Sequence, residues 1–257
     1  MAEGLSRCWR VVATGLSFSV FGVGGLLLRL LVFPLLNVFV RRPQKRVVLA
    51  RGVIRIAFRA FVWMMQTLGV LRYEIIGGER LQRGGLLILA NHPSLIDTVF
   101  LMAFVKRADC IVKGRLWDNP FTRGPVQAAG YINNDAGLDL IEDCIASLRR
   151  GDNLIIFPEG TRTPQDGAIS LKRGAANVAV RGGRDVTPVV IRCEPATLGK
   201  GEKWWRVPPR RVQFRIEVRE DIAIQRFTVD GTAETIAARR LTDYLQHYFT
   251  EEVRGHA

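Results

Sequence analysis

The most informative stretch of this chain is Leu86-Leu87-Ile88-Leu89-Ala90-Asn91-His92-Pro93-Ser94-Leu95-Ile96-Asp97. Its apolar run, Leu86–Ala90, has the length and composition of a buried strand and ends in polar residues and a proline. The arrangement recurs where the apolar run Leu154–Ile156 leads into Phe157-Pro158-Glu159-Gly160-Thr161-Arg162. Because open α/β sheets build their sites at the carboxyl ends of strands, both strings are expected at one edge of a sheet.

The polar residues of the two strings indicate a particular chemistry. His92 is the only histidine before position 247, and Asp97 follows it by five residues. The second string supplies a carboxylate in Glu159, a flexible backbone at Gly160 and a cation in Arg162. An imidazole paired with a carboxylate can act as a general base, so the two strings together suit deprotonation of a hydroxyl beside an anionic substrate.

Each string also has a structural reading. Ser94-x-x-Asp97 fits a helix capping box, in which Asp97 is structural and His92 is a loop histidine. Such a carboxylate in the first helical turn can still reach back to an imidazole. In the second string, residues 158–161 fit an ordinary turn and Arg162 a solvated charge. The order of both strings, each behind an apolar run, favours the functional reading.

From residue 73 onward, strand and helix patterns alternate, which predicts an α/β sheet with helices on its faces. We expect strands at Tyr73–Ile76, Leu86–Ala90, Cys110–Val112, Leu154–Phe157, Thr187–Arg192 and Val212–Val218. We expect helices at Ser94–Val105, Leu138–Arg149, Gly174–Arg181 and Ala233–Thr250. The chain of 257 residues is long enough for one large core or two small ones.

Charge and cysteine content limit the class of protein. The net charge of +13 calls for a polyanionic partner, either nucleic acid or an anionic membrane surface. No nucleic-acid-binding motif is present, so no nucleic-acid partner is expected. The spacing of Cys8, Cys110, Cys144 and Cys193 suggests neither a disulfide framework nor a metal site, which favours a reducing, cytosol-facing domain.

The amino-terminal lead, Val11–Val40, carries a single charge, Arg29, and one proline, Pro34. It is long enough for a single membrane span, whereas no small-residue cleavage site of a signal peptide follows it. Basic residues flank it on both sides, and both flanks therefore favour the cytoplasmic face. A monotopic or re-entrant helical hairpin, broken between Arg29 and Pro34, satisfies both flanks and is preferred here over a single span.

Two further segments have open alternatives. The apolar segment Gly52–Leu71 carries Arg55 and Arg59, which share one helical face with the preceding Arg51. This pattern fits an interfacial amphipathic helix or a helix packed on the domain with its arginines facing solvent. Leu198–Arg211 carries Trp204-Trp205 among basic residues. That composition suits a membrane interface, an acidic carrier protein or a plain surface loop.

Taken together, the motifs resemble those of the 1-acylglycerol-3-phosphate acyltransferases, the PlsC-like lysophospholipid acyltransferases. The pair Asn-His-x4-Asp and Phe-Pro-Glu-Gly-Thr-Arg is similar to the family's first and third motifs. The second motif is matched by Val112-Lys113-Gly114, Asn119-Pro120-Phe121, Gly124 and Gly130-Tyr131-Ile132, and the fourth by Val186-Thr187-Pro188-Val189-Val190-Ile191. The likeness spans roughly residues 72 to 220, with the blocks in family order.

The resemblance implies a mixed sheet flanked by helices, with an acyltransferase domain at residues 72–257 behind a membrane-associated helical lead at residues 1–71. It also implies O-acyl transfer from a thioester, acyl-CoA or an acyl-carrier protein, to the hydroxyl of a lysophospholipid. His92 and Asp97 carry over as the catalytic pair and Lys113 as an oxyanion or donor residue. Glu159, Gly160, Thr161 and Arg162 carry over as acceptor-binding residues, and no metal or cofactor is implied.

One departure from the family pattern concerns the acceptor. The second motif commonly ends Phe-Ile-Asp-Arg, whereas this chain has Tyr131-Ile132-Asn133-Asn134. Asn134 removes a cation that helps to hold the acceptor phosphate, so another lysolipid or a hydroxylated specialised lipid stays open. A non-catalytic lipid-binding protein is the alternative from another class. The expected location is the inner (cytoplasmic) membrane, with the catalytic domain facing the cytoplasm.

Overall fold

A computed structural model describes residues 2–120, 122–135, 137–164, 166–229 and 231–255. Within those residues, seven strands form one mixed sheet in the order β1-β7-β6-β2-β5-β3-β4. The five strands from β6 to β4 run parallel, while β7 pairs antiparallel with β6 and parallel with β1. The carboxyl ends of β6, β2, β5, β3 and β4 therefore meet at one edge, which we call the site edge.

The described elements follow one another along the chain with these bounds: α1 Ala2–Leu27, a π-helical turn Leu28–Val32, α2 Phe33–Phe39, α3 Pro43–Thr67, β1 Leu71–Ile76, a 3-10 turn Gly78–Gln82, β2 Leu87–Ala90, α4 Asp97–Phe104, β3 Ala108–Val112, α5 Arg115–Asp118, α6 Arg123–Ala128, β4 Ile132–Asn133, a 3-10 turn Gly137–Asp139, α7 Leu140–Arg149, β5 Asn153–Ile156, α8 Gly174–Gly182, β6 Val186–Glu194, β7 Val212–Val218, a 3-10 turn Ile224–Arg226 and α9 Glu234–Arg254.

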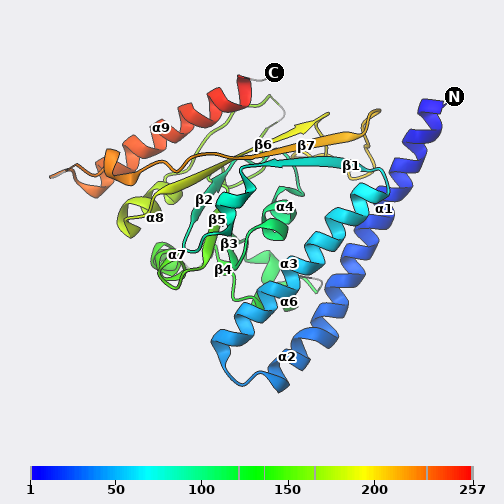
Figure 1. The fold of residues 1–257 in the computed structure, drawn as a ribbon, viewed down its shortest axis with the longest axis horizontal. Coiled ribbons are helices and arrows are strands. Elements are labelled where there is room, and N and C mark those ends of the chain that lie inside the picture. Colours follow the sequence, from blue (N-terminus) through cyan, green and yellow to red (C-terminus); the bar gives the residue numbers. More distant parts are fainter. Residues whose placement is uncertain (1, 121, 136, 165, 230, 256–257) are drawn as a thin grey trace.

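The sheet separates two apolar cores because neighbouring residues of a strand point to opposite faces. In β2, Ile88 and Ala90 join the core under α3 and α4, while Leu87 and Leu89 join the core under α7, α8 and α9. Figure 1 shows α7, α8 and α9 on one side of the sheet, and α4, α3 and α1 on the other. Since β2 is buried on both faces, its unbroken apolar run is the pattern of a central parallel strand.

The predicted mixed α/β sheet flanked by helices is confirmed. All six predicted strands are present within two residues at each end, but the two-residue strand β4 was not predicted. The helix expected from Ser94 begins at Asp97, and the short helices α5 and α6 were also missed. Residue 71, the predicted end of the membrane lead, is the first residue of β1.

The predicted helix break between Arg29 and Pro34 is wrong. Helix α1 continues through a π-helical turn directly into α2, and the chain reverses only at residues 40–42. A proline clashes with the carbonyl four residues before it, and the wider π turn just ahead of Pro34 accommodates this without a break. The helical hairpin therefore consists of α1 and α2 running against α3, not of two halves of the lead.

The predicted solvent or membrane exposure of Arg51 is also wrong. Its guanidinium is buried and forms ion pairs with Asp109 at 2.8 Å and Asp152 at 3.2 Å. It also donates to the carbonyl of Ala129 at 2.9 Å. Arg59, two turns further along α3, is exposed. On one face of α3, Arg51 therefore joins the helix to the sheet, whereas Arg59 does not.

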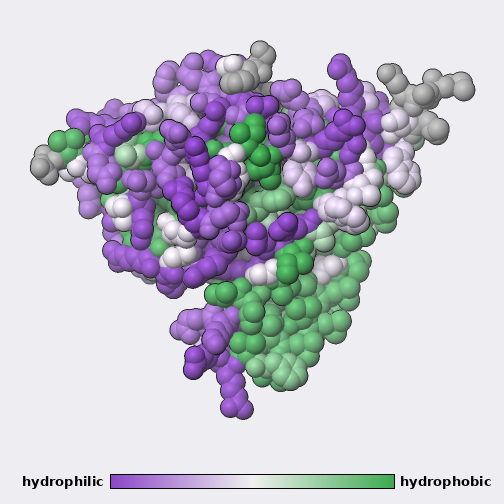
Figure 2. Space-filling model, in the orientation of Figure 1, coloured by the Kyte–Doolittle hydropathy of each residue, from purple (hydrophilic) through white to green (hydrophobic). Residues whose placement is uncertain are grey.

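The outer face of the hairpin is apolar. Figure 2 shows one continuous hydrophobic surface over it, next to a largely hydrophilic remainder of this side of the molecule. The described residues of α1 and α2 contain a helical stretch, Ser6–Phe39, that is long and apolar enough to cross a membrane. Its exposed large apolar side chains are Trp9, Val12, Leu16, Val20, Val23, Leu27, Leu30, Leu31, Leu35, Val38 and Phe39.

Candidate active site

The two motif strings meet at the site edge. His92 follows β2 by two residues and Glu159 follows β5 by three, and β2 and β5 are parallel neighbours. Asn91 fixes the start of the first string, because its side chain exchanges two hydrogen bonds with the backbone of Ile191 in β6, at 2.8 and 2.7 Å. The loop after β2 therefore leaves the sheet in a defined direction.

His92 and Asp97 form the predicted pair. The imidazole Nδ1 lies 3.0 Å from Asp97 Oδ2, and the same oxygen accepts from the Ser94 backbone N–H at 2.6 Å. The imidazole also stacks on the Phe157 ring, with centroids 4.1 Å apart. Asp97 is fully buried, whereas the His92 side chain is 16% exposed. With Nδ1 directed at the carboxylate, the remaining ring nitrogen, Nε2, is the one that can serve a substrate.

Of the predicted capping box, only the hydrogen bond to the Asp97 carboxylate is present. Asp97 does accept from Ser94 N–H, but α4 has no side-chain cap at its first turn and the Ser94 hydroxyl has no hydrogen-bond partner among the described residues. The Asp97 carboxylate thus orders the loop and orients His92 at once. Burial raises the pKa of Asp97, and the hydrogen bond from His92 opposes that shift.

Glu159 connects the second string to the first. Its Oε1 accepts from the His92 backbone N–H at 2.9 Å and from the Thr163 hydroxyl at 2.9 Å. The Thr163 backbone N–H donates to the His92 carbonyl at 2.7 Å. Burial raises the pKa of Glu159. Glu159 is 4% exposed, and its carboxylate therefore joins the loop after β2 to the loop after β5.

Gly160 is where a lysine crosses the second string. Its φ of +68° lies in the left-handed region, and a Cβ there would stand 2.9 Å from Lys172 Nζ. Glycine therefore permits both the turn and the close approach of the Lys172 chain. Lys172 is anchored by its own N–H, which donates to the Pro158 carbonyl at 2.8 Å. This cation was missed from the sequence, since it lies outside both strings.

Arg162 and Thr161 are half-buried beside the pair. The Arg162 NH1 donates to the carbonyls of Leu198 and Gly199 at 2.8 and 2.7 Å, so part of the guanidinium is occupied by the segment that follows β6. Arg162 is nonetheless close enough to favour the charged form of Asp97. The reading of Arg162 as a purely solvated charge does not fit these contacts.

Lys113 and Asn134 lie at the same edge but further along it. Lys113 follows β3, which is separated from β2 by β5, and at the usual strand spacing this places the two strand ends roughly 10 Å apart. Both Lys113 and Asn134 are exposed, and the Asn134 N–H donates to Val112 O at 2.9 Å. No described contact joins either residue to His92. Phe121, quoted in the second motif, lies outside the described residues.

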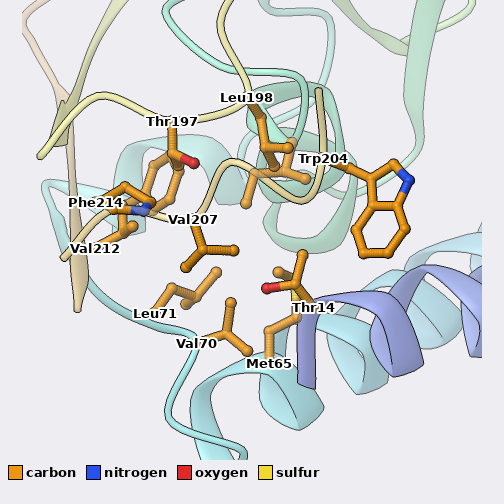
Figure 3. Close-up of a pocket in the computed structure, with 12 residues that line it drawn as sticks. Thr14, Met65, Val70, Leu71, Thr197, Leu198, Trp204, Val207, Val212 and Phe214 are labelled. Carbon is orange, nitrogen blue, oxygen red and sulfur yellow. The ribbon is translucent and has the colours of Figure 1, made fainter. Parts of the chain in front are cut away.

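An apolar pocket lies between the hairpin and the residue before Asp97, and Figure 3 shows the side chains that line it. Ile96, directly before Asp97, lines it together with Leu198, Trp204, Phe214, Thr14 of α1 and Met65 of α3. Its volume is about 20 Å³. A cavity of this size has room for about one water molecule, so a long acyl chain fits only if the walls move.

The cysteines offer no competing nucleophile. Burial raises the pKa of Cys144 and Cys193 to about 12 and that of Cys110 still further, so these thiols stay protonated at neutral pH. Cys8 is exposed on α1. Among the residues that the structure describes, no cluster of three or more metal-ligating side chains occurs.

Comparison with known proteins shows which family the central part of the chain resembles. A family model described as acyltransferase matches residues 72–192, which contain both strings and the Lys172 chain. Residues 72–192 are therefore similar to the acyltransferase family. This confirms the resemblance read from the motifs.

Several relatives share part of the chain. A 1-acyl-sn-glycerol-3-phosphate acyltransferase of Pseudomonas aeruginosa is 29% identical over 145 residues, 54% of this chain and 56% of that protein. One from Helicobacter pylori is 27% identical over 176 residues, 64% of this chain and 70% of that protein. The chain spans about half the length of the first of these relatives.

A solved structure shares the whole fold. The crystal structure of the 1-acyl-sn-glycerophosphate acyltransferase PlsC from Thermotoga maritima covers 96% of this chain and 97% of its own, with a TM-score of 0.67 and 21% identity. The common fold extends over the helical hairpin as well as the sheet.

Proposed function

We propose that this acyltransferase moves a fatty acyl chain from a thioester donor, acyl-CoA or an acyl-carrier protein, to the hydroxyl of a lysophospholipid such as 1-acylglycerol-3-phosphate. The observation that carries the proposal is the His92–Asp97 pair at the edge of the sheet, where His92 Nδ1 lies 3.0 Å from Asp97 Oδ2 and Arg162 acts on the Asp97 charge. The family relatives are named for this acceptor.

The proposed chemistry needs no covalent enzyme intermediate. His92 Nε2 takes the proton of the acceptor hydroxyl while its oxygen attacks the thioester carbonyl carbon, which forms the new C–O bond. Asp97 holds the other ring nitrogen and stabilises the imidazolium that results. As the tetrahedral intermediate collapses, the C–S bond breaks and the leaving thiolate receives the proton from His92, which gives an ester and a free thiol.

The acceptor is proposed to lie over the second string. Lys172, whose side chain lies against Gly160, and the free part of Arg162 supply positive charge for a phosphate. Glu159 holds the loop in place through Thr163 and the His92 backbone, and Thr161 is proposed to lie beside the acceptor. Lys113, at the end of β3, is proposed to serve the donor or the oxyanion, a role that rests on the family's second motif.

A second acceptor class is favoured by Asn134. This neutral residue stands where the family pattern has an arginine, so a lysolipid without a phosphomonoester, or a hydroxylated specialised lipid, is the alternative substrate. Lys172 argues for the phosphorylated acceptor, because it adds a cation within the site.

The membrane position follows from the hairpin. The Ser6–Phe39 stretch is about 51 Å long as a helix, far more than the roughly 30 Å of a bilayer core. Helix α3 packs on α4 of the catalytic domain and α1 packs on α3, so an upright span would carry the domain into the lipid. We propose that the apolar face lies in one leaflet, with the exposed Arg41, Arg42 and Lys45 of the turn at head groups of the inner membrane's cytoplasmic face.

The test is a substrate panel run on purified protein in lipid nanodiscs. Acyl-CoA and acyl-carrier protein are each offered with 1-acylglycerol-3-phosphate and with lysolipids that lack the phosphomonoester, and the ester products are resolved by mass spectrometry. Transfer to 1-acylglycerol-3-phosphate is expected. Transfer to another acceptor alone supports the second class, and no product from any pair supports a lipid-binding protein without catalysis.

A further inference from the structure

The segment Leu198–Arg211, which joins β6 to β7 at the site edge, presents a surface that the reaction does not use. Its exposed residues include two tryptophans and four cations, namely Lys200, Lys203, Trp204, Trp205, Arg206 and Arg210. Lys203 Nζ lies 5.1 Å from the centre of the Trp205 ring. The single carboxylate of the segment, Glu202, is turned back onto the Gly199 N–H at 2.8 Å. The outer surface is therefore aromatic and positive.

This surface continues the apolar face of the hairpin. The Trp204 ring packs on α1 at Gly15, where an added Cβ would stand 3.1 Å from the ring. Val12 and Leu16, on the same side of α1 as Gly15, are 63% and 50% exposed. Figure 3 shows the Trp204 side chain directed toward α1. The tryptophan thus lies at the border of the hydrophobic face.

The segment is fixed to both α1 and the active site. Arg7 Nε donates to Val207 O at 3.2 Å, and Arg10 NH2 donates to Pro209 O at 2.5 Å. At its other end, the Leu198 carbonyl accepts from Arg162 NH1 and from Leu95 N–H. Trp204 and Leu198 also wall the apolar pocket behind Asp97.

We infer that Leu198–Arg211 is a second membrane contact, which places Trp204 and Trp205 at the interface of an anionic leaflet and its lysines and arginines at lipid phosphates. Tryptophans favour the boundary between head groups and acyl chains, and basic side chains are drawn to anionic lipid. Continuity with the hairpin face and the half-exposed indoles favour lipid over an acidic carrier protein. The inference deepens the proposed membrane position and does not depend on acyl transfer.

The first test reads the depth of one indole. Trp9, Trp63, Trp117 and Trp204 are replaced by Phe, so that Trp205 alone fluoresces, and the full chain is placed in nanodiscs that contain brominated phosphatidylglycerol. Strong quenching relative to unbrominated nanodiscs is expected. The matched control carries its only tryptophan at α9 through Tyr244→Trp and should not be quenched. An unquenched Trp205 overturns the inference, and so does a Trp205 signal that changes only when acyl-carrier protein is added.

The second test uses the unaltered chain, which avoids any loss of folding in the multiple variant. Hydrogen–deuterium exchange of residues 198–211 is compared between anionic and purely zwitterionic nanodiscs, and slower exchange is expected in the anionic ones. Removal of Lys203 and Arg206 by substitution with Gln should weaken binding to anionic vesicles about 25-fold, since each such cation contributes about fivefold. Arg239→Gln with Arg240→Gln on α9 is the equal-charge control. Equal exchange in both nanodiscs, or equal losses in both variants, contradicts the inference.

Discussion

Asp97 is fully buried, and its carboxylate orients His92 at the expense of stability. Because burial raises its pKa above the ordinary 3.8, the ionised form destabilises the folded state once the pH exceeds that value. Asp97→Asn removes this cost. The variant is expected to lose turnover yet to show a higher Tm than the parent at pH 7, with the difference shrinking as the pH falls toward 4. A lower Tm that is constant with pH would show that Asp97 is stabilising.

Lys172 gives a second prediction at the residue scale. If its ammonium meets the acceptor phosphate beside Gly160, Lys172→Ala should lower kcat/KM for 1-acylglycerol-3-phosphate by about 10- to 100-fold, the worth of one hydrogen bond to a charged group. Acceptors without a phosphate should be affected little, and Lys172→Arg should recover part of the loss. The neighbouring exposed Arg173, changed to Ala, is the control. Equal losses for all acceptors would place Lys172 outside the phosphate site.

Helix α3 is joined to the sheet by one buried cation. Arg51 pairs with Asp109 and Asp152, and Asp152 keeps Arg107 when Arg51 is removed, whereas Asp109 retains no ion pair among the described residues. Loss of one partner from a buried pair costs about 3–5 kcal/mol. Arg51→Met should therefore lower Tm by roughly 10 °C. Arg55→Met, on the same helical face, should change it little, and a similar loss in both variants would contradict the assignment.

The sequence predicts those elements whose pattern is local. The apolar run before His92 identifies β2, and the five-residue spacing to Asp97 suffices to foresee the pair. Helical spacing places Arg51, Arg55 and Arg59 on one face but does not tell which of them meets a carboxylate. Asp109 of β3 and Asp152, directly before β5, are both distant from α3 in the sequence. Lys172 reaches Gly160 only through the folded loop. The predicted helix break near Pro34 is wrong because a π-helical turn accommodates the proline and the helix continues.

At the scale of the whole molecule, the hairpin is the basis of the proposed membrane position. Cys8 near the start of α1 and the turn at residues 40–42 lie at opposite ends of the Ser6–Phe39 stretch. If that stretch lies in one leaflet, both ends face the same compartment. Labelling by a membrane-impermeant maleimide in sealed inside-out vesicles should reach both Cys8 and, in a Cys8→Ser background, Gln44→Cys. Protection of one of the two would show a span.

His92 is proposed to be the general base for acyl transfer, and single-turnover kinetics on the full chain in nanodiscs measure this role. With 1-acylglycerol-3-phosphate and a thioester donor both saturating, His92→Ala should reduce the rate of ester formation by at least ~10²-fold, the usual contribution of general base catalysis. Binding to nanodiscs should stay unchanged, since the described contacts of His92 are with Asp97, Glu159, Thr163 and Phe157 and not with the hairpin. Ester formation by His92→Ala at a rate near that of the parent protein would contradict the account.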